Sequence, residues 1–384
     1  MSFLSHLACG KCGLRHEADE RQNLCSACAK PLLAVYDVEA AKERVTKKLW
    51  EKGRDDLWRF VDMLPVRRAR FITSLGEGMT PLLEGKRLAE ELGLPHLLIK
   101  DEGGNPTGSF KARGMAAAVS KARELGVSRF AVPSAGNAGA ALAAYAARAG
   151  AEADVYLPAD TPAGIARECE AFGASVHLVK GLITDAAKEV QARADAGEVF
   201  DISTLREPYR AEGKKTLGYE IVMQNGWHMP DVVVYPTGGG TGIVGMWKAF
   251  DEMEQLGLVG PERPRMVSVQ AEGCAPIVRA LAEGKEEATT WEDAKTGAWG
   301  LRVPRAIGDF LILRALRESE GAAIAVSERA IADAQRDMAR LAGLDASPEG
   351  AAALAGVRAL ADEGGIERGE TVVAFNTGAA WPYR

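Results

Sequence analysis

The chain has 384 residues, and its 47 lysines and arginines against 53 aspartates and glutamates give a formal net charge of −6. Hydrophobic residues make up 47% and charged residues 26% of the chain, a balance that is typical of globular proteins and excludes wholesale disorder or a coiled coil. Because the cations are interleaved with more anions, we expect no nucleic-acid partner and no anionic membrane surface as partner. The length predicts two or three domains. No run of about 18 apolar residues and no leader-like start is evident, so we expect a cytoplasmic protein.

Four of the six cysteines crowd into the first 28 residues, as Cys9, Cys12, Cys25 and Cys28. Each Cys-x2-Cys pair can place two thiolates on one tight turn, and four thiolates can then form a tetrahedral site that suits zinc. Four protein ligands leave no position for water, so such a zinc ion would be structural rather than catalytic. Four reduced thiols without metal are the alternative. The spacing predicts a zinc-ribbon-like segment over residues 1–34.

Beyond this segment, residues 38–64 have helix-like spacing and end before Pro65, which predicts one outer helix. Strands and helices then alternate with short connections. Strands are predicted at 97–100, 129–133, 153–157 and 175–179, with helices at 114–125, 138–149, 163–172 and 184–196. A second series has strands at 231–235, 265–270 and 371–376, with helices at 243–256, 328–342 and 350–363. Such alternation indicates parallel strands, so the sequence predicts an α/β protein with two parallel-sheet domains. Residues 284–307 show no clear period.

A single lysine follows a run of turn-forming residues within segment 101–115. Residues 105–108 predict a tight bend, and Ser109 is a candidate N-cap that places Lys111 in the first helical turn. The helix dipole and the apolar neighbours disfavour a charge there, so the neutral amine would be available for a Schiff base. A solvated lysine at a helix start is the alternative.

Two loops of small residues each join a predicted strand to a predicted helix. The loop over residues 133–139 could bind a carboxylate with its amides, and the Asn137 side chain could donate to a ring oxygen. The glycine-rich loop over residues 236–242 could bind a phosphate at the start of the next helix. Residues 240–245 also match the G-x-G-x-x-G fingerprint of dinucleotide-dependent oxidoreductases, with Glu254 as a possible ribose ligand. That alternative fits less well, because Glu254 falls within the same predicted helix.

A lysine, an amide loop and a glycine loop, in this order, are the parts that hold pyridoxal phosphate. Together with Gly-Glu-Gly-Met-Thr-Pro-Leu at 76–82 and with Thr377-Gly378, they give a chain that resembles the fold type II, tryptophan-synthase-β-like pyridoxal phosphate enzymes. Within that family the similarity is greatest to the threonine synthases and threonine-synthase-like proteins. The resemblance extends from about Gly76 to Thr377, and some of these proteins also begin with a four-cysteine ribbon.

The resemblance implies a role for each matched residue. Lys111 would carry the cofactor as a Schiff base and move protons, Asn137 would contact the ring hydroxyl, and Thr377 would face the pyridine nitrogen. Glu349 matches an acidic position that lines the site. The cofactor phosphate would bind at Gly238, Gly239, Gly240, Thr241 and Gly242, and the substrate carboxylate at Ser134, Ala135, Gly136 and Asn137. A phosphorylated substrate would find cations in Arg113, Arg210 and Lys215, with Lys214 beside them; a solvated charged face is the alternative for these.

The family also implies a homodimer and a division of the chain into domains. Residues 35–113 and 205–384 would form a large cofactor-binding domain, and residues 114–204 a smaller mobile domain. The implied activity is elimination and replacement on a small amino-acid substrate, as in the conversion of O-phosphohomoserine and water to threonine and phosphate.

Departures from the family pattern keep other functions open. Ala112, Ala135 and Ala138 stand where threonine synthases usually have Asp, Thr and Thr, and residues 379–382 lack the usual Gly-x-Lys. A serine or threonine dehydratase-like ammonia-lyase is therefore the alternative enzyme. A binding or regulatory protein whose working part is the ribbon is the alternative of another class.

Overall fold

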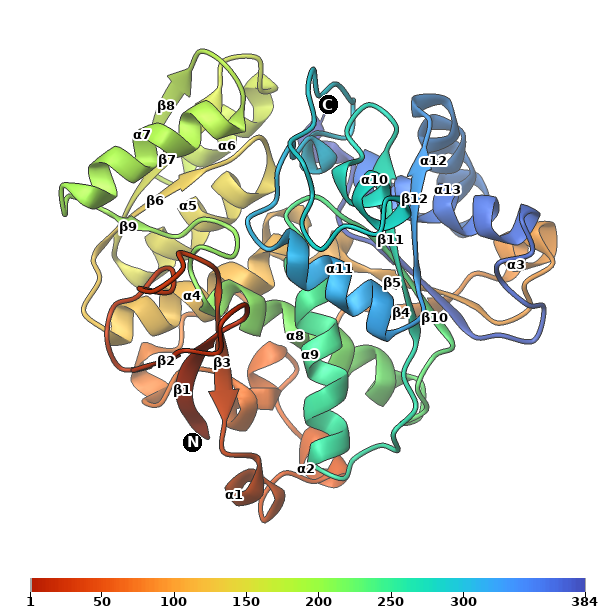
Figure 1. Cartoon of the computed structure of the whole chain (residues 1–384), viewed down its shortest axis with the longest axis horizontal. Helices are drawn as coiled ribbons and strands as arrows, with labels where there is room; N and C mark the ends of the chain where they lie inside the picture. Colours follow the sequence, from red (N-terminus) through yellow and green to blue (C-terminus); the bar gives the residue numbers. More distant parts are fainter. Residues whose placement is uncertain (1, 384) are drawn as a thin grey trace. The chain divides into compact units, whose positions relative to one another are not determined.

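The computed structural model describes residues 2–383, which form two compact units. Residues 2–79, 105–216 and 382–383 form the first unit, and residues 80–104 and 217–381 form the second (Figure 1). The structure thus groups residues 35–79 and 105–113 with residues 114–204. The domain boundaries expected from the sequence, which place these residues in a large cofactor-binding domain, stay a prediction about function.

The first unit contains two sheets. A small antiparallel sheet has the order β2 (Arg15–His16), β1 (Leu4–Cys9) and β3 (Leu32–Tyr36). The second sheet is parallel and has the order β8 (Ser175–Val179), β7 (Glu152–Pro158), β6 (Arg129–Pro133) and β9 (Phe200–Asp201). Consecutive residues of β6 and β7 are buried, which is the pattern of a parallel strand covered on both faces.

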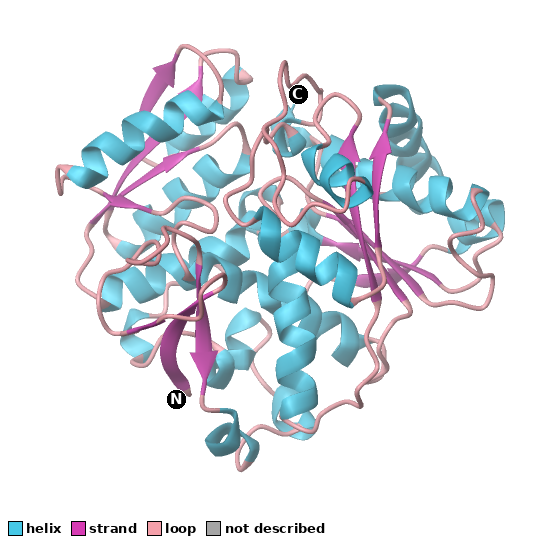
Figure 2. Cartoon of the chain, viewed as in Figure 1, coloured by secondary structure: helices cyan, strands magenta, loops and turns pink. Residues whose placement is uncertain are grey.

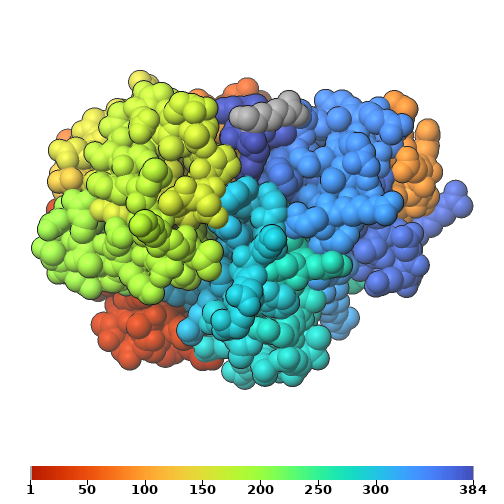
Figure 3. Space-filling view, turned by 90° about the horizontal axis from the view of Figure 1, so that it is seen from above, coloured from red at the N-terminus to blue at the C-terminus, as the bar shows by residue number. Residues whose placement is uncertain are grey.

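Helices follow the strands of the parallel sheet, as Figure 2 shows. α5 and α7 both pack on β6 and β7, and α4 packs on α5. In the space-filling view the chain around α6 and α7 forms one continuous yellow-green surface (Figure 3). These helices are α4 (Lys111–Glu124), α5 (Asn137–Ala149), α6 (Ala163–Ala171) and α7 (Ile183–Asp195), and α8 (Tyr209–Gln224) begins in the same unit.

The single outer helix predicted over residues 38–64 is wrong. The segment instead forms α1 (Val38–Lys42), α2 (Lys47–Glu51) and a 3-10 helix, η1 (Leu57–Met63). The side chains of Asp37, Thr46 and Asp56 each accept a hydrogen bond from an amide at the start of one of these pieces. Since each such N-cap starts a new helix, the segment cannot continue as one.

The second unit is built on a six-stranded sheet of order β12, β11, β10, β13, β5, β4. Its strands are β12 (Ala322–Val326), β11 (Arg265–Ala271), β10 (Val232–Pro236), β13 (Val372–Asn376), β5 (Leu97–Asp101) and β4 (Leu82–Glu84). All neighbours are parallel except β4, which pairs antiparallel with β5. The predicted α/β class is confirmed, and the antiparallel edge strand is an addition to it.

Every residue of β10 and β13 is buried, because helices cover the sheet. α13 packs on both strands, and α10 and α11 pack on β11. The helices of this unit are α3 (Lys86–Leu92), α9 (Thr241–Gln255), α10 (Pro276–Ala282), α11 (Asp309–Glu318), α12 (Glu328–Ala342) and α13 (Pro348–Asp362). The unassigned residues 284–307 form loops with one short 3-10 helix, η5 (Trp299–Leu301).

The register of the parallel strands places two loops at one edge of this sheet. Val234 of β10 pairs with Ala374 of β13, so Pro236 and Asn376 end their strands at the same edge. The loops that follow, 237–240 and 377–380, therefore leave the sheet side by side, where ligands bind in parallel α/β sheets. Within residues 2–383, no helix combines the length and the apolar character needed to span a bilayer.

Asp154 on β7 joins Arg129, His177 and Arg193 of the first unit and is only 2% exposed. Its carboxylate accepts hydrogen bonds from Arg129 Nε at 2.9 Å and Arg193 Nη1 at 3.1 Å, and it lies 2.9 Å from His177 Nε2. Burial acts to raise the pKa of Asp154, but the hydrogen bonds from Arg129, His177 and Arg193 outweigh it and lower the pKa below its usual value. The folded state therefore favours the ionised form.

Asp154→Asn should lower the free energy of unfolding at neutral pH by about 1–3 kcal/mol, because the cations lose a charged acceptor. A lowered folded-state pKa gives stability that is present above the unfolded pKa of about 3.9 and is lost as the pH falls through the folded value. Chemical denaturation should thus show a difference between wild type and variant that shrinks toward about pH 3. Glu189→Gln, an exposed change on α7, is the control; a difference that stayed constant with pH would contradict the assignment.

Candidate active site

Lys111 is the first residue of α4, as the sequence predicts. The bend before it is a short 3-10 helix, η4 (Pro106–Gly108), in which Thr107 has a left-handed φ of 58°. The N-cap residue of the helix is Phe110 and not Ser109, which was predicted. Ser109 Oγ nevertheless accepts a hydrogen bond from the amide of Lys111 at 3.4 Å. The Lys111 amine lies 4.4 Å from the centre of the Phe110 ring.

A second lysine holds this helix start. Lys214 on α8 is fully buried, and its Nζ donates to the carbonyls of Phe110 at 2.6 Å and of Lys111 at 3.1 Å. The helices touch closely here, because a Cβ on Gly213 would overlap the carbonyl of Arg113. Sequence reasoning treated Lys214 only as a possible phosphate ligand. Its position shows that it stabilises the backbone that presents Lys111.

The small-residue loop after β6 is organised by Ser134. Ser134 Oγ donates to the carbonyl of Gly136 at 2.7 Å and accepts from the amides of Gly136 at 3.2 Å and Gly139 at 3.0 Å. α5 begins directly afterwards at Asn137, whose Nδ2 donates to the Tyr383 hydroxyl at 3.3 Å. The expected strand, loop and helix order around Ala135 is confirmed, whereas Tyr383 carries no sequence signal that links it to this loop.

The motif at 76–82 contributes a buried carboxylate to the first unit. Glu77 is fully buried and accepts hydrogen bonds from Trp58 Nε1 at 2.9 Å, Tyr145 Oη at 2.5 Å and the amide of Leu75 at 2.8 Å. Burial raises the pKa of Glu77 despite these donors. Since Tyr145 lies on α5, Glu77 ties this motif to the helix that begins at the Ser134 loop.

Two of the cations proposed for a substrate phosphate are buried among protein acceptors. Arg113 is fully buried, and its Nη1 donates to Thr216 Oγ1 at 3.0 Å. Arg210 is 1% exposed and donates from Nη1 to the carbonyl of Ile202 at 2.8 Å. Burial lowers the pKa of Arg210 to about 10. Their role toward a substrate stays a prediction.

Lys215, the third residue proposed for a substrate phosphate, contacts other protein groups. It is fully buried, with Nζ 2.7 Å from Glu212 Oε2 and 3.7 Å from the centre of the Tyr36 ring. Tyr36 ends β3 of the small antiparallel sheet. These contacts give Lys215 a structural role between α8 and that sheet, and its binding of a phosphate stays a prediction.

In the second unit, the glycine-rich loop joins β10 to α9. Space is short at its glycines: a Cβ on Gly238 would overlap the Gly300 carbonyl, and one on Gly240 would overlap the Ile312 side chain. Gly240 also has a left-handed φ of 85°. Within residues 2–383, the amides from Gly238 to Gly242 have no protein acceptor. Open amides at a helix start form an anion site, so this loop fits a phosphate group.

The loop after β13 lies at the same sheet edge. Thr377 is buried, and the next residue, Gly378, accepts a hydrogen bond through its carbonyl from the amide of Ser347 at 2.8 Å. Glu349 in the first turn of α13 accepts from the amide of Gly300 at 2.6 Å with one oxygen. Its other oxygen is buried and has no partner within the described part of the chain. Glu349 thus bonds Gly300, the residue whose carbonyl lies against Gly238. Its second oxygen is available to accept a hydrogen bond from another molecule.

The four N-terminal cysteines form one cluster whose Sγ atoms all lie within 4.8 Å of one another. The sulfur atoms are 3.4 Å apart for Cys9 and Cys28, 3.7 Å for Cys12 and Cys25, and 3.6 Å for Cys12 and Cys28. Zinc–sulfur bonds of about 2.3 Å require tetrahedral edges of about 3.8 Å, so the arrangement fits zinc. Burial acts to raise the pKa of Cys9, but the amides of Cys12 and Lys11 lower it to about 7, which favours a thiolate ligand.

The chain matches the pyridoxal-phosphate dependent enzyme family over residues 73–378. It is 39% identical to a threonine synthase from Methanosarcina acetivorans, over 97% of this chain and 91% of the relative, and 38% identical to one from Methanocaldococcus jannaschii, over 96% and 91%. Among solved structures, a threonine deaminase isoform from Solanum lycopersicum aligns with a TM-score of 0.66 and 25% identity, over 78% of this chain and 83% of that one. The fold type II resemblance inferred from the motifs is confirmed. This chain belongs to the pyridoxal-phosphate dependent enzymes and is threonine-synthase-like.

Proposed function

We propose that this enzyme converts O-phosphohomoserine and water to threonine and phosphate. One observation carries the proposal: the threonine synthases from two archaea align with nearly the whole chain, at 39% and 38% identity, and the chain covers 91% of each of them. An alignment of this length extends over both units. The residues proposed to bind the cofactor and the substrate also lie in both units.

The residues of each unit fit the cofactor that the family implies. Lys111 supplies a primary amine for its aldehyde, and the open amides from Gly238 to Gly242 suit its phosphate. Asn137 and Thr377 would contact the ring hydroxyl and the ring nitrogen. When bound, pyridoxal phosphate stabilises negative charge on the substrate α-carbon.

The chain's own residues would then bind the substrate and move its protons. Amides of the loop from Ser134 to Asn137 would hold the substrate carboxylate at the start of α5. The Lys111 amine would take the proton from the α-carbon and return it later. Glu349 would offer its unpartnered oxygen as an acid or base, because its other oxygen is fixed by Gly300. The proposed partners of the substrate phosphate remain Arg113, Arg210 and Lys215.

A cytoplasmic homodimer completes the proposal, and sedimentation of the purified protein would test the dimer.

Purified enzyme should release phosphate and threonine in equal amounts from O-phosphohomoserine. Lys111→Ala should reduce this rate by at least about 100-fold, because the proton carrier is removed. Lys180→Ala, which removes an exposed lysine of the same unit, should keep full activity. Lack of threonine formation by wild-type enzyme would exclude the synthase reaction while leaving the family assignment intact.

Ammonia release from serine or threonine is the second candidate reaction. The likeness to the tomato threonine deaminase favours it, as do the alanines at 112, 135 and 138 in place of the polar residues usual in threonine synthases. Formation of a 2-oxo acid from threonine, with no release of phosphate from O-phosphohomoserine, would establish this reaction in place of the first.

Gly240→Ala should weaken cofactor binding by at least about tenfold. The new Cβ meets the Ile312 side chain and forces a left-handed residue away from φ 85°, so the open amides shift. Gly257→Ala is a matched control, because Gly257 also has a positive φ, of 70°, but has no heavy atom within 4 Å of the added Cβ. Titration of apoenzyme with pyridoxal phosphate, followed by visible absorbance, measures both affinities. Equal losses in both variants would contradict a phosphate site at Gly240.

We further propose that the cysteine cluster binds one structural zinc ion per chain. Elemental analysis of the purified protein should find this zinc, and Cys12→Ser should lose it, because three thiolates and a hydroxyl bind zinc more weakly. Cys169→Ala, a buried cysteine outside the cluster, should retain it. Equal zinc content in the two variants would show that the cluster is not the binding site.

A further inference from the structure

The segment between the two cysteine pairs, residues 13–24, packs on the first unit, and we call it the ribbon loop. Asn23 Nδ2 donates to the carbonyl of Asp201 at the end of β9, at 2.8 Å. The hydroxyl of Tyr209, the first residue of α8, donates to the carbonyl of Ala18 at 2.8 Å. The ribbon loop is therefore attached to a strand of the parallel sheet and to the start of α8.

Arg21 of the ribbon loop attaches it to a third element, the end of α4. Its Nε donates to the carbonyl of Leu125 at 3.2 Å, and its Nη2 donates to the carbonyl of Gly126 at 2.9 Å. The last carbonyls of a helix have no intrahelical donor and favour a cation. Arg21 thus provides, from a distant part of the sequence, the donors that close the carboxyl end of α4.

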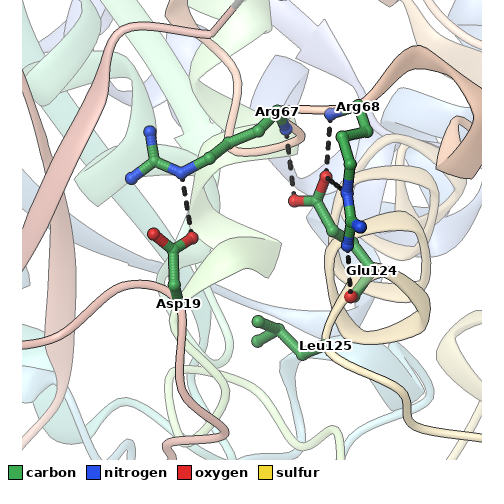
Figure 4. A pocket seen from close by; sticks show the side chains of 5 residues that line it. All are labelled: Asp19, Arg67, Arg68, Glu124 and Leu125. Carbon is green, nitrogen blue, oxygen red and sulfur yellow. Dashed lines mark hydrogen bonds and ion pairs between the residues drawn. The ribbon is translucent and has the colours of Figure 1, made fainter.

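Asp19 adds an ion-pair network at the same place. Its Oδ1 lies 2.9 Å from Arg67 Nε and 3.2 Å from Lys121 Nζ, and the fully buried Lys121 lies 2.9 Å from Glu124. Glu124 also accepts from the amides of Arg67 at 3.2 Å and Arg68 at 2.7 Å. Asp19, Arg67, Arg68 and Glu124 line a cavity of about 460 Å³ together with Leu125. Figure 4 shows the bonds of Arg67 to Asp19 and of Arg67 and Arg68 to Glu124 in this lining. The last turn of α4 is thereby linked to the ribbon loop through side chains as well as backbone.

The other end of α4 is Lys111. The helix has 14 residues, or about 21 Å, and it joins Lys111 to the end that Arg21 contacts. Lys214 holds that first turn from α8, and α8 contacts the ribbon loop through Tyr209. Lys215 of α8 also lies on Tyr36, at the end of the strand that follows the cysteines. Both helices that position Lys111 are in contact with the four-cysteine segment.

The ends of the ribbon loop are fixed by Cys12 and Cys25, whose sulfur atoms are 3.7 Å apart. A metal ion bound by both would close the loop and reduce its conformational freedom. We propose that metal binding at the cysteine cluster positions Lys111, by holding the ribbon loop and, through Arg21, the carboxyl end of α4. The inference rests on the proposed metal site and on the proposed role of Lys111. It makes Arg21 a positioning residue that contacts neither the metal ion nor Lys111.

Hydrogen exchange of the full-length holoenzyme tests this coupling. Removal of zinc with a chelator should accelerate exchange of the amides at the end of α4, around residues 123–127, by about tenfold. The reason is that the hydrogen bonds from Arg21 to the carbonyls of Leu125 and Gly126 weaken, so this turn opens more often. Peptides from α9 in the second unit should not change. Unchanged exchange in α4 after measured loss of zinc would overturn the proposal, as would the absence of zinc from the purified protein.

Arg21→Met should accelerate the same amides while zinc is still bound, and chelation should then add little. Arg15→Met makes the same substitution on β2, at an exposed residue with no contact to α4, and should behave as wild type. Arg21→Lys keeps a cation beside the two carbonyls and should restore part of the protection. Equal responses of the Arg21→Met and Arg15→Met variants to chelation would refute a path through Arg21.

Exchange is read without turnover, so the outcome is separate from the proposed reaction. A chelator response in α4 without threonine formation would support the coupling and reject only the substrate. Threonine formation with no response in α4 would reject the coupling and leave the reaction in place. The visible circular dichroism of the bound cofactor should also change in Arg21→Met but not in Arg15→Met, which reports directly on the setting of Lys111.

Discussion

Open backbone amides where a helix follows a parallel strand are the feature on which the site depends. A parallel strand ends at the edge of its sheet, and the next helix begins with amides that have no acceptor within the helix. At Gly238 and Gly240 the neighbouring Gly300 carbonyl and Ile312 side chain leave no room for a Cβ atom. Only backbone fits at these two positions, and the open amides of the loop would suit a phosphate without a cation.

The position of Lys111 depends on a different interaction. Its helix start is held by the buried Lys214, whose Nζ donates to the carbonyls of Phe110 and Lys111. A buried amine is costly unless it is hydrogen-bonded, so these bonds fix where Lys214 lies. Lys100 in the second unit follows the same rule, with Glu220, Gln224 and the carbonyl of Thr80 around it. Such buried, fully bonded lysines favour one arrangement of the elements that they join.

Local patterns were enough to predict the elements around the site. Strands at 129–133 and 175–179 and the helix at 328–342 have the predicted bounds, because each combines strong periodicity with clear turn residues. The position of Lys111 and the two small-residue loops followed from the same signals. α8 was missed, because all of its first ten residues are buried and its polar residues do not gather on one side of the helix.

Contacts between distant residues left no trace in the local pattern. The roles of Lys214 and Lys215 differ although they are neighbours, since one bonds carbonyls at Lys111 and the other pairs with Glu212 against Tyr36. The hydrogen bond of Asn137 to Tyr383 joins residues 246 positions apart. Only the folded backbone decides which side of a helix each of these side chains reaches. Periodicity therefore predicts elements, whereas the partners of buried charges require the three-dimensional structure.

The cysteine cluster is local in sequence, but its docking partners are not. Its sulfur contacts join residues at most 19 positions apart, whereas Arg21 reaches Gly126 across 105 positions and Ala18 reaches Tyr209 across 191. At a translation rate of about 5–20 residues per second, the cysteines leave the ribosome roughly 5 to 40 seconds before these partners. The four cysteines are therefore able to come together before α4 and α8 are available to pack on the ribbon loop.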